Sequence, residues 1–364
     1  MSAWEEFFAC YCRWRVVYLR TAERATRSKS MASPWKILVV GAGAVGGTLA
    51  VRLAAAGHTV SVLARGAHLQ AIQRAGLCLE DPQERVCVEV QASDDLADFA
   101  PQDLVILGLK AHQLGPVLPQ LRPLLHADTV VLPAINGVPW WYFHADTSPQ
   151  ARTAQGRTAH LESIDPGGRL LGAIDPAHLV GCVVHASAEV ASPGVIRGNG
   201  QYRYVIGEPT HTRSPRVQAL ADLLRAAGCE PEVTDRIRDA IWMKLVGNAT
   251  FNPVAALTRA RMNAICDNPE LVALIRDGMA EIMGLARAYG CDPLVSIEQR
   301  MEIARGIGPV KTSTLQDLER GRALEIAALL HAPLEMARLA HHPMTTLQTL
   351  SALLGELDRQ VCKA

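Results

Sequence analysis

The sequence predicts an α/β protein, with an N-terminal Rossmann-like dinucleotide-binding domain followed by an all-α C-terminal domain. Three observations lead to this prediction: a glycine-rich turn between an apolar strand and a helix, further strand-length apolar runs after it, and a change to helical patterning from Arg236. The expected domains are residues 36–235 and 236–364, preceded by an extension over residues 1–35.

The glycine turn lies in the stretch KILVVGAGAVGG, residues 36–47. Gly41, Gly43 and Gly46 follow the G-x-G-x-x-G spacing between an expected strand over 37–40 and a helix over 44–56. Gly41 permits the sharp turn, Gly43 lets a pyrophosphate approach the backbone, and Gly46 lets the helix pack closely. A second strand over 59–64 supports a nucleotide site, and a ligand-free glycine turn is the alternative.

The end of the second strand indicates which dinucleotide is bound. A NAD site usually carries an acidic residue there, to bind the ribose 2′-hydroxyl. This sequence has Arg65 instead, and a guanidinium suits a 2′-phosphate. We therefore expect NADP(H), and the alternative is that Arg65 is a solvated loop charge.

Composition limits the class of protein. The 364 residues are 49% hydrophobic and 20% charged with a net charge of zero, which disfavours nucleic-acid and membrane partners. The nine cysteines are scattered without zinc spacing, so we expect reduced thiols in a cytoplasmic protein. Three interpretations of residues 1–35 stay open: Met31 is the true initiator, the stretch is a peripheral helix, or it is a targeting peptide. The glutamates in the stretch argue against a targeting peptide.

Polar residues follow two further expected strands of the first domain. Lys110 follows the apolar run 103–109, and Asn136 follows the run 129–135, so both lie at strand carboxyl ends, where α/β sheets bind ligands. Lys110 could equally be a solvated lysine, and Asn136-Gly137 an ordinary turn. The irregular, aromatic-rich loop 139–171 is either a lid or a surface insertion. The other expected elements are helices over 68–75, 113–125 and 214–227, and strands over 77–80, 86–91, 179–189, 194–206 and 232–235.

The second domain begins with a helix that carries an unusual polar stripe. Lys244, Asn248 and Asn252 are spaced i, i+4, i+8 and share one face. Burying such groups without partners costs roughly 1–3 kcal/mol each, so a stripe facing a ligand cleft is favoured over a solvent-facing one. Pro253 is expected to end or kink this helix at Asn252. Further helices are expected over 269–289, from Ser313, and over 343–361.

These motifs together resemble the ketopantoate reductase (2-dehydropantoate 2-reductase) family over about residues 36–335. The resemblance rests on GAGAVGG, LGLKAHQ, the Asn-Gly after a strand, WMKLVGNATFNPVAAL, and STLQD followed by Glu325-Ile326. It implies that Lys244 is the general acid and Glu325 its acidic partner, which orients the lysine or binds a substrate hydroxyl. The substrate-binding residues that it implies are Asn248, Asn252 and Ser313. Together with the glycine turn, the cofactor-binding set is Gly41, Gly43, Ala44, Val45, Gly46, Arg65, Lys110 and Asn136.

The sequence departs from the family pattern beside the expected substrate site. Ala327 stands where Asp usually follows Glu-Ile, Leu330-His331 replaces an Asn-Gly, and the loop after Asn136 is longer and more aromatic. Ser313 alone would also fit a helix N-cap, with Gln316 completing a capping box. These changes leave the reaction type intact and open the question of the substrate.

The resemblance implies NADPH-dependent reduction of a 2-oxo acid, with ketopantoate as the expected substrate and no metal. Reduction of another branched 2-oxo acid or of an imine is one alternative, and a non-catalytic NADP(H)-binding regulatory protein is another. The joint presence of Lys244, Asn248, Asn252, Ser313 and Glu325 favours the enzyme, because a sensor needs no such set. Two interpretations of the final helix stay open: it covers the domain, or it makes a contact in a homodimer.

Overall fold

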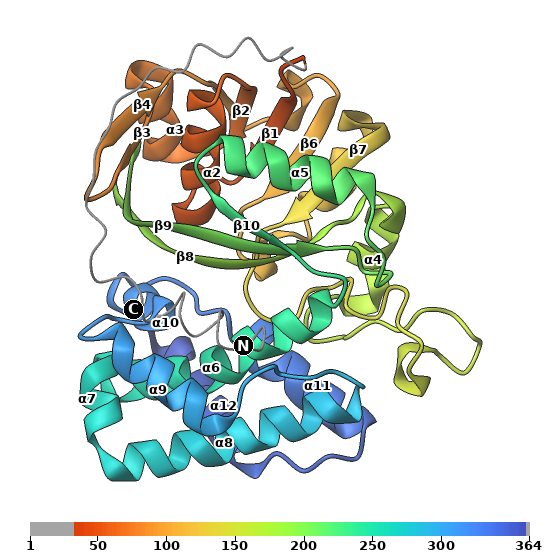
Figure 1. Cartoon of the computed structure of the whole chain (residues 1–364), viewed down its shortest axis with the longest axis vertical. Helices are drawn as coiled ribbons and strands as arrows, with labels where there is room; N and C mark the ends of the chain where they lie inside the picture. The colour runs from red at the N-terminus through yellow and green to blue at the C-terminus, as the bar shows by residue number, and fades with distance from the viewer. Residues whose placement is uncertain (1–32, 362–364) are drawn as a thin grey trace, which may run out of the picture. The chain divides into compact units, whose positions relative to one another are not determined.

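A five-stranded, all-parallel sheet carries the glycine turn (Figure 1). The computed structural model describes residues 33–361. The strand order is β5-β2-β1-β6-β7, so the order reverses beside β1, where such sheets bind nucleotides. The strands are β1 (Lys36–Val40), β2 (Thr59–Leu63), β5 (Gln91–Ser93), β6 (Gln102–Leu107) and β7 (Leu125–Pro133). This sheet confirms the predicted Rossmann-like fold.

Strand β1 is central, and its apolar residues Ile37 to Val40 are fully buried, as expected for a parallel strand covered on both faces. Helix α2 (Ala44–Ala55) follows the glycine turn and packs against strands of both sheets in the molecule. A Cβ on Gly47 would come within 2.8 Å of the Ile196 side chain in the second sheet. Helix α3 (Gly66–Ala75) follows β2.

A second sheet was not predicted from the sequence. Its order is β10-β9-β3-β4, with β8 paired to β9 in a long antiparallel hairpin. Figure 1 shows β8 and β9 crossing between the first sheet and the C-terminal helices. The strands are β3 (Leu77–Glu80), β4 (Arg85–Val88), β8 (Gly181–Ser192), β9 (Val195–Gly207) and β10 (Glu230–Val233), and helix α5 (Pro215–Ala226) packs on β10.

The C-terminal part is helical and is organised around α6 (Ile237–Thr258), which contacts α8, α10 and α12. Its core contains Trp242, Phe251 and Met279, all at most 1% exposed. The domain boundary predicted at residue 235 falls between β10 and α6 and stays a prediction. The other helices are α7 (Met262–Asp267), α8 (Pro269–Ala288), α9 (Ile297–Ile307), α10 (Ser313–Glu319), α11 (Ala332–Leu339) and α12 (Thr345–Val361).

Prolines bear on two of the predictions, one for the helix over 113–125 and one for the end of the helix at Asn252. The helix expected over 113–125 is instead two 3₁₀ segments, η2 (Ala111–Gln113) and η3 (Leu118–Leu124), because Pro116, Pro119 and Pro123 lack the N–H donor of a regular helix. Helix α6, in contrast, does not end at Asn252 but continues through Pro253 to Thr258. Buried residues on both sides of Pro253 pack into the core, and this packing outweighs the lost hydrogen bond.

The expectation of reduced thiols is wrong for two cysteines. Cys78 and Cys87 form a disulfide, because β3 and β4 pair antiparallel and place the two residues directly opposite each other. Their spacing along the chain gives no sign of this, since it depends on the hairpin register. The other cysteines of the described region are buried free thiols, Cys182, Cys229, Cys266 and Cys291.

The aromatic residues after Asn136 belong to the core. Trp140, Trp141, Tyr142 and Phe143 are each at most 4% exposed, so this start of the loop 139–171 is not a surface insertion. Tyr142 receives a hydrogen bond from Trp242 Nε1 at 2.7 Å, which joins the loop to α6.

Residues 33–361 lack two features. No helix among them is both long and apolar enough to span a membrane. The same residues contain no group of three or more His, Cys, Asp or Glu side chains that could hold a metal ion. The extension over residues 1–35 lies, as far as residue 32, outside the described part of the chain.

Candidate active site

Two glycines of the turn after β1, Gly41 and Gly46, are required by local geometry. Gly41 has φ of +97°, in the region that favours glycine, and a Cβ there would lie 2.6 Å from the Leu109 side chain. A Cβ on Gly46 would run into the Gly41 carbonyl oxygen. Gly108, after β6, is equally constrained, because its Cβ would lie 2.8 Å from that same oxygen and from Gly46 Cα. Gly108 was not predicted from the sequence.

Gly43, in contrast, faces open space. A Cβ there would meet only the Gly108 carbonyl oxygen, at 4.0 Å. Gly43 is the N-cap of α2 and offers no side-chain acceptor, and the first turn, which begins with Ala44 and Val45, contains no acidic residue. The N–H groups of this turn and the helix dipole therefore suit an anionic group such as a pyrophosphate. The chain's own residues fit a bound dinucleotide.

Two basic residues border the strand carboxyl ends. Arg65 is the exposed N-cap residue of α3, directly after β2, and forms no ion pair with any other residue in the range 33–361. Lys110 follows β6, but its Nζ is 2.8 Å from Asp317 Oδ2 and donates to the Ala323 carbonyl at 3.0 Å. Lys110 therefore joins the end of β6 to α10 in this structure.

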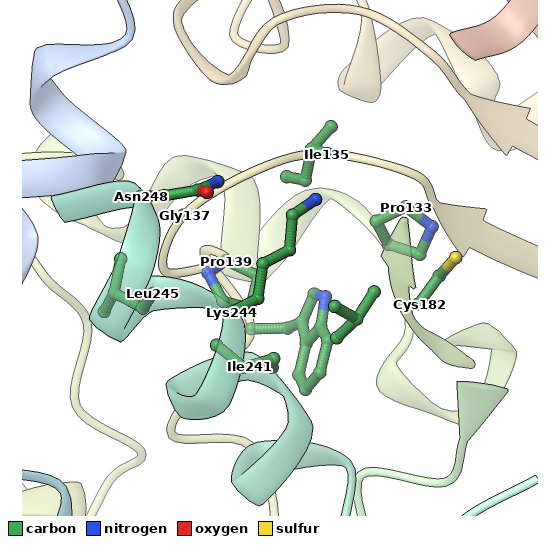
Figure 2. Close-up of a pocket in the computed structure, with 11 residues that line it drawn as sticks. Pro133, Ile135, Gly137, Pro139, Cys182, Ile241, Lys244, Leu245 and Asn248 are labelled. Carbon is green, nitrogen blue, oxygen red and sulfur yellow. The ribbon is translucent and has the colours of Figure 1, made fainter. Parts of the chain in front are cut away.

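A pocket lies between the end of β7, strand β8 and helix α6. Figure 2 shows Lys244 extending from α6 into it, and Asn248 beside the loop that carries Gly137. Its lining is mostly apolar, as in many small-molecule sites. The lining residues are Pro133, Ile135, Gly137, Pro139, Trp141, Cys182, Val183, Ile241, Lys244, Leu245 and Asn248.

Lys244 is held by two oxygen acceptors. Its Nζ donates to Asn136 Oδ1 at 2.6 Å and to the Val184 carbonyl. Burial lowers the pKa of Lys244 to about 8, although Cys182 and Glu325 act in the opposite direction. An ammonium group has three N–H donors, so these two acceptors leave one for a ligand. The structure therefore presents a half-buried ammonium group with a lowered pKa at the pocket.

Asn136 connects Lys244 to Glu325. Burial raises the pKa of Glu325, while Lys110 and a side-chain hydrogen bond from Asn136 oppose this increase. The structure thus brings together Lys244, Asn136, Glu325 and Lys110, which come from four separate segments of the chain. The sequence indicated each residue, but not that Asn136 would lie between the lysine and the glutamate.

The remaining predicted substrate residues are placed differently. Asn252 is 6% exposed on α6, so the stripe is not a solvent-facing one, but Asn252 is not among the residues that line the pocket. Ser313 is exposed at the first residue of α10. The N-cap is Thr312, whose side chain accepts from the Leu315 N–H, so the alternative of Ser313 as N-cap is wrong.

The segment that departs from the family pattern packs against the Asn136 turn. Residues Ala327–His331 form a π-helix, η7, a form that is frequent at functional sites. The Ala328 carbonyl accepts from the Val138 N–H at 2.9 Å, and a Cβ on Gly137 would lie 2.5 Å from that carbonyl oxygen. The segment that follows Glu325 therefore packs, through the Ala328 backbone, against the turn that holds Asn136.

Strand β8 contributes groups that the sequence did not indicate. The Val184 carbonyl holds Lys244, and the Cys182 thiol lines the pocket. His185 follows directly; burial and then Lys244, Arg203 and Arg300 lower its pKa to about 3, so its imidazole is neutral. A backbone carbonyl leaves no signal in a sequence, which is why this wall of the pocket was missed.

Comparisons with known proteins agree with this geometry. The ketopantoate reductase PanE/ApbA model matches residues 37–211, and the model of its C-terminal region matches residues 236–358. A 2-dehydropantoate 2-reductase of Mesorhizobium japonicum is 43% identical over 88% of this chain and 97% of its own length.

Solved structures show the same arrangement of domains. A candidate ketopantoate reductase from Ralstonia solanacearum MolK2 is 40% identical, with a TM-score of 0.83 over 90% of this chain and 99% of its own. A 2-dehydropantoate 2-reductase from Geobacter metallireducens GS-15 is 26% identical, with a TM-score of 0.76 over 88% of this chain and 99% of its own. With both halves of the chain matched and relatives this similar over most of their length, the chain belongs to the ketopantoate reductase family.

Proposed function

We propose that this chain is an NADPH-dependent reductase of a 2-oxo acid, with ketopantoate (2-dehydropantoate) as substrate and pantoate as product. The observation that carries the proposal is Lys244, whose half-buried ammonium group lines the pocket and is held by Asn136 and the Val184 carbonyl. Family membership and the name of the Mesorhizobium japonicum relative support the choice of substrate.

The residues that would hold NADP(H) are those of the glycine turn and the start of α2, Gly41, Gly43, Ala44, Val45 and Gly46, with Arg65 at the 2′-phosphate. When bound, the cofactor supplies the hydride. The open space above Gly43 and the uncapped N–H groups of α2 support this assignment. Lys110 and Asn136 border the same strand ends, at the switch point of the sheet.

Lys244 is proposed as the general acid. Reduction of a ketone builds negative charge on its oxygen, and the free N–H of an ammonium group both stabilises that charge and donates the proton. A pKa of about 8 leaves Lys244 protonated at neutral pH, yet makes it a better proton donor than an ordinary lysine. Asn136 and Val184 direct the ammonium group toward the pocket.

Glu325, Asn248, Asn252 and Ser313 complete the proposed machinery. Glu325 acts through Asn136, which it orients, so we propose it as a positioning residue for Lys244. Asn248 lines the pocket and can hydrogen-bond the substrate. Ser313 lies exposed at the start of α10 and would bind the substrate carboxylate there, with Asn252 deeper on α6.

The substrate is tested by comparing ketopantoate with 2-oxo acids that have the same branched carbon but lack its hydroxyl. The polar side chains at the pocket predict a higher kcat/KM for ketopantoate, because a buried hydrogen-bonding group is left unpaired by an analogue without its partner. Equal kcat/KM values across the panel would reject ketopantoate as the preferred substrate while leaving the reductase assignment intact.

The pH dependence of the reduction follows from Lys244. The protonated amine is the active form and predominates below its pKa of about 8, so we expect kcat to be level at neutral pH and to fall as the pH rises through 8. The measurement is kcat at saturating NADPH and substrate over this range. A rate that increases above pH 8 would argue that Lys244 acts as a base or is not involved.

Substitution of Gly46 tests the cofactor turn. In Gly46→Ala the new methyl group would run into the Gly41 carbonyl, so α2 must shift away from the turn. Overpacking of this kind costs about 1–3 kcal/mol, so we expect NADPH affinity to fall by about tenfold or more. Gly306→Ala on α9 is the matched control, since its Cβ would meet nothing within 4 Å. Unchanged NADPH affinity in Gly46→Ala would contradict the assignment.

Substitution of Arg65 tests the preference for NADPH. Charge-assisted hydrogen bonds contribute about 1.5–3 kcal/mol, so Arg65→Ala should weaken NADPH binding by about tenfold and leave NADH binding unchanged. The measurement is titration of each dinucleotide by fluorescence. Arg74→Ala, an exposed arginine in the last turn of the same helix, is the control. An equal loss for both dinucleotides would place Arg65 away from the 2′-phosphate.

A homodimer formed through the C-terminal helices is proposed as well. Leu339 at the end of α11 and Leu353 on α12 are 46% and 53% exposed, which is high for large apolar side chains. Light scattering on the wild-type chain and on Leu353→Glu tests this. A wild-type monomer at micromolar concentration would contradict it.

A further inference from the structure

The disulfide of the second sheet lies in an accessible place. Cys78 on β3 and Cys87 on β4 are direct partners in the antiparallel register. Cys78 is 7% exposed, whereas Cys87 is an exposed residue on the last strand of the sheet. The other four cysteines among residues 33–361 are buried, so among these six a reagent in solution reaches this pair first.

A chain of hydrogen bonds links this disulfide to the glycine turn. The Cys78 N–H donates to the Gly194 carbonyl at 2.9 Å, and the Gly194 N–H donates to His68 Nδ1 at 3.0 Å. Because Nδ1 accepts, Nε2 carries the ring proton and donates to the Ala42 carbonyl at 2.8 Å. Ala42 stands between Gly41 and Gly43, so three hydrogen bonds connect a cysteine of the disulfide to the turn.

The same hairpin also holds α2. Asp81, in the turn between β3 and β4, accepts from Arg52 Nη2 of α2 at 2.7 Å and from the Tyr202 hydroxyl at 2.9 Å. The Arg52 guanidinium also lies 4.7 Å from the centre of the Tyr202 ring. The hairpin closed by the disulfide therefore contacts the nucleotide-binding element at two points, through His68 and through Arg52.

We propose that the Cys78–Cys87 disulfide is a reversible redox site, exchanged with low-molecular-weight thiols, and that its state sets the affinity of the glycine turn for NADP(H). The proposal rests on the proposed cofactor site. The closed disulfide fixes the β3–β4 pair and hence the Cys78 N–H that begins the chain to Ala42. Reduction releases this constraint, so the oxidised protein is expected to bind NADPH more tightly.

The exchange is balanced with glutathione as the co-reactant. A glutathione thiolate attacks the exposed Cys87 sulfur, the Cys87–Cys78 bond breaks, and Cys78 leaves as a thiolate that takes up a proton. A second glutathione thiolate attacks the mixed disulfide, which releases glutathione disulfide and the Cys87 thiol. In total, two glutathione thiols are oxidised to one glutathione disulfide, and the protein disulfide is reduced to two cysteine thiols. Glutathione disulfide reverses both steps.

The test is the Kd of NADPH for the full chain, measured by fluorescence in an oxidising and in a reducing glutathione buffer. Mass spectrometry reports the state of Cys78 and Cys87 in each buffer. We expect the Kd to be about fivefold higher in the reduced protein, at the lower end of common coupling strengths. Equal Kd values in the two states, or free Cys78 and Cys87 thiols in the oxidising buffer, would overturn the proposal.

Two variants test separately the disulfide and the hydrogen-bond chain that links it to the glycine turn. Cys87→Ser, at the exposed position, should bind NADPH with a single Kd in both buffers, which excludes effects of glutathione on the other cysteines. His68→Phe removes both ring hydrogen bonds and should weaken NADPH binding and reduce its redox dependence, while the Arg52–Asp81 contact remains. Full redox dependence in either variant would contradict the proposal.

These outcomes also distinguish this proposal from that of the enzyme's function. NADPH binding of equal strength in both states would reject the redox proposal and leave the reductase proposal standing. Failure to bind NADPH in either state would reject both proposals.

Discussion

Replacement of Lys244 by alanine is expected to lower kcat for reduction by about a hundredfold to ten-thousandfold, the range for loss of a positioned general acid. The variant loses the donor that is held against Asn136 and Val184 in the pocket. Its NADPH affinity should be unchanged, because the glycine turn belongs to a different element. Steady-state kinetics with ketopantoate and NADPH, together with a binding titration, measure both quantities.

Lys244→Arg is the matched control for this prediction. It keeps the positive charge, but a guanidinium is a far weaker acid than an ammonium group whose pKa is about 8. Its kcat should therefore remain close to that of Lys244→Ala rather than to the wild type. Wild-type kcat in either variant would show that the proton comes from another source.

Replacement of Arg238 by methionine is expected to lower the free energy of unfolding by about 3–5 kcal/mol, as for the loss of one member of a buried polar network. Arg238 is 2% exposed on α6. Its guanidinium donates to the carbonyl oxygens of Tyr142 at 2.9 Å, Pro209 at 2.7 Å and His144. Asp146 lies 4.0 Å away and would be left with an uncompensated buried charge.

Urea denaturation measures this loss as a lower midpoint. The control is Arg225→Ala, whose ion pair with Asp222 is solvent-exposed and is worth about 1 kcal/mol at most. A loss for Arg238→Met no larger than that of Arg225→Ala would contradict the account of a network that fixes the aromatic loop on α6. Because that loop follows Asn136, we also expect a higher KM for the substrate.

Much of the first sheet was predictable, because local chemistry determines it. Continuous apolar runs identify β1, β6 and β7, and the glycine spacing identifies the turn before α2. The i, i+4 spacing of Lys244 and Asn248 likewise predicted a shared face, and both residues line the pocket. Each of these signals lies within a few residues of the feature that it predicts.

The rest depends on contacts between distant parts of the chain. Whether β8 and β9 join the first sheet or form a second one depends on pairing with β3, more than 100 residues earlier in the chain. The disulfide depends on hairpin register, and the placement of Lys244 depends on the Val184 carbonyl, which any residue type would provide. Such pairings leave no local signal in a single sequence.

The most direct test of the central claim is to add ketopantoate to the wild-type protein with NADPH and follow the loss of NADPH absorbance, with pantoate quantified at the end. The account predicts catalytic turnover, with one pantoate formed for each NADPH consumed. Tight NADPH binding without turnover of ketopantoate or of any other 2-oxo acid would contradict it, and would show that the Lys244 pocket serves binding alone.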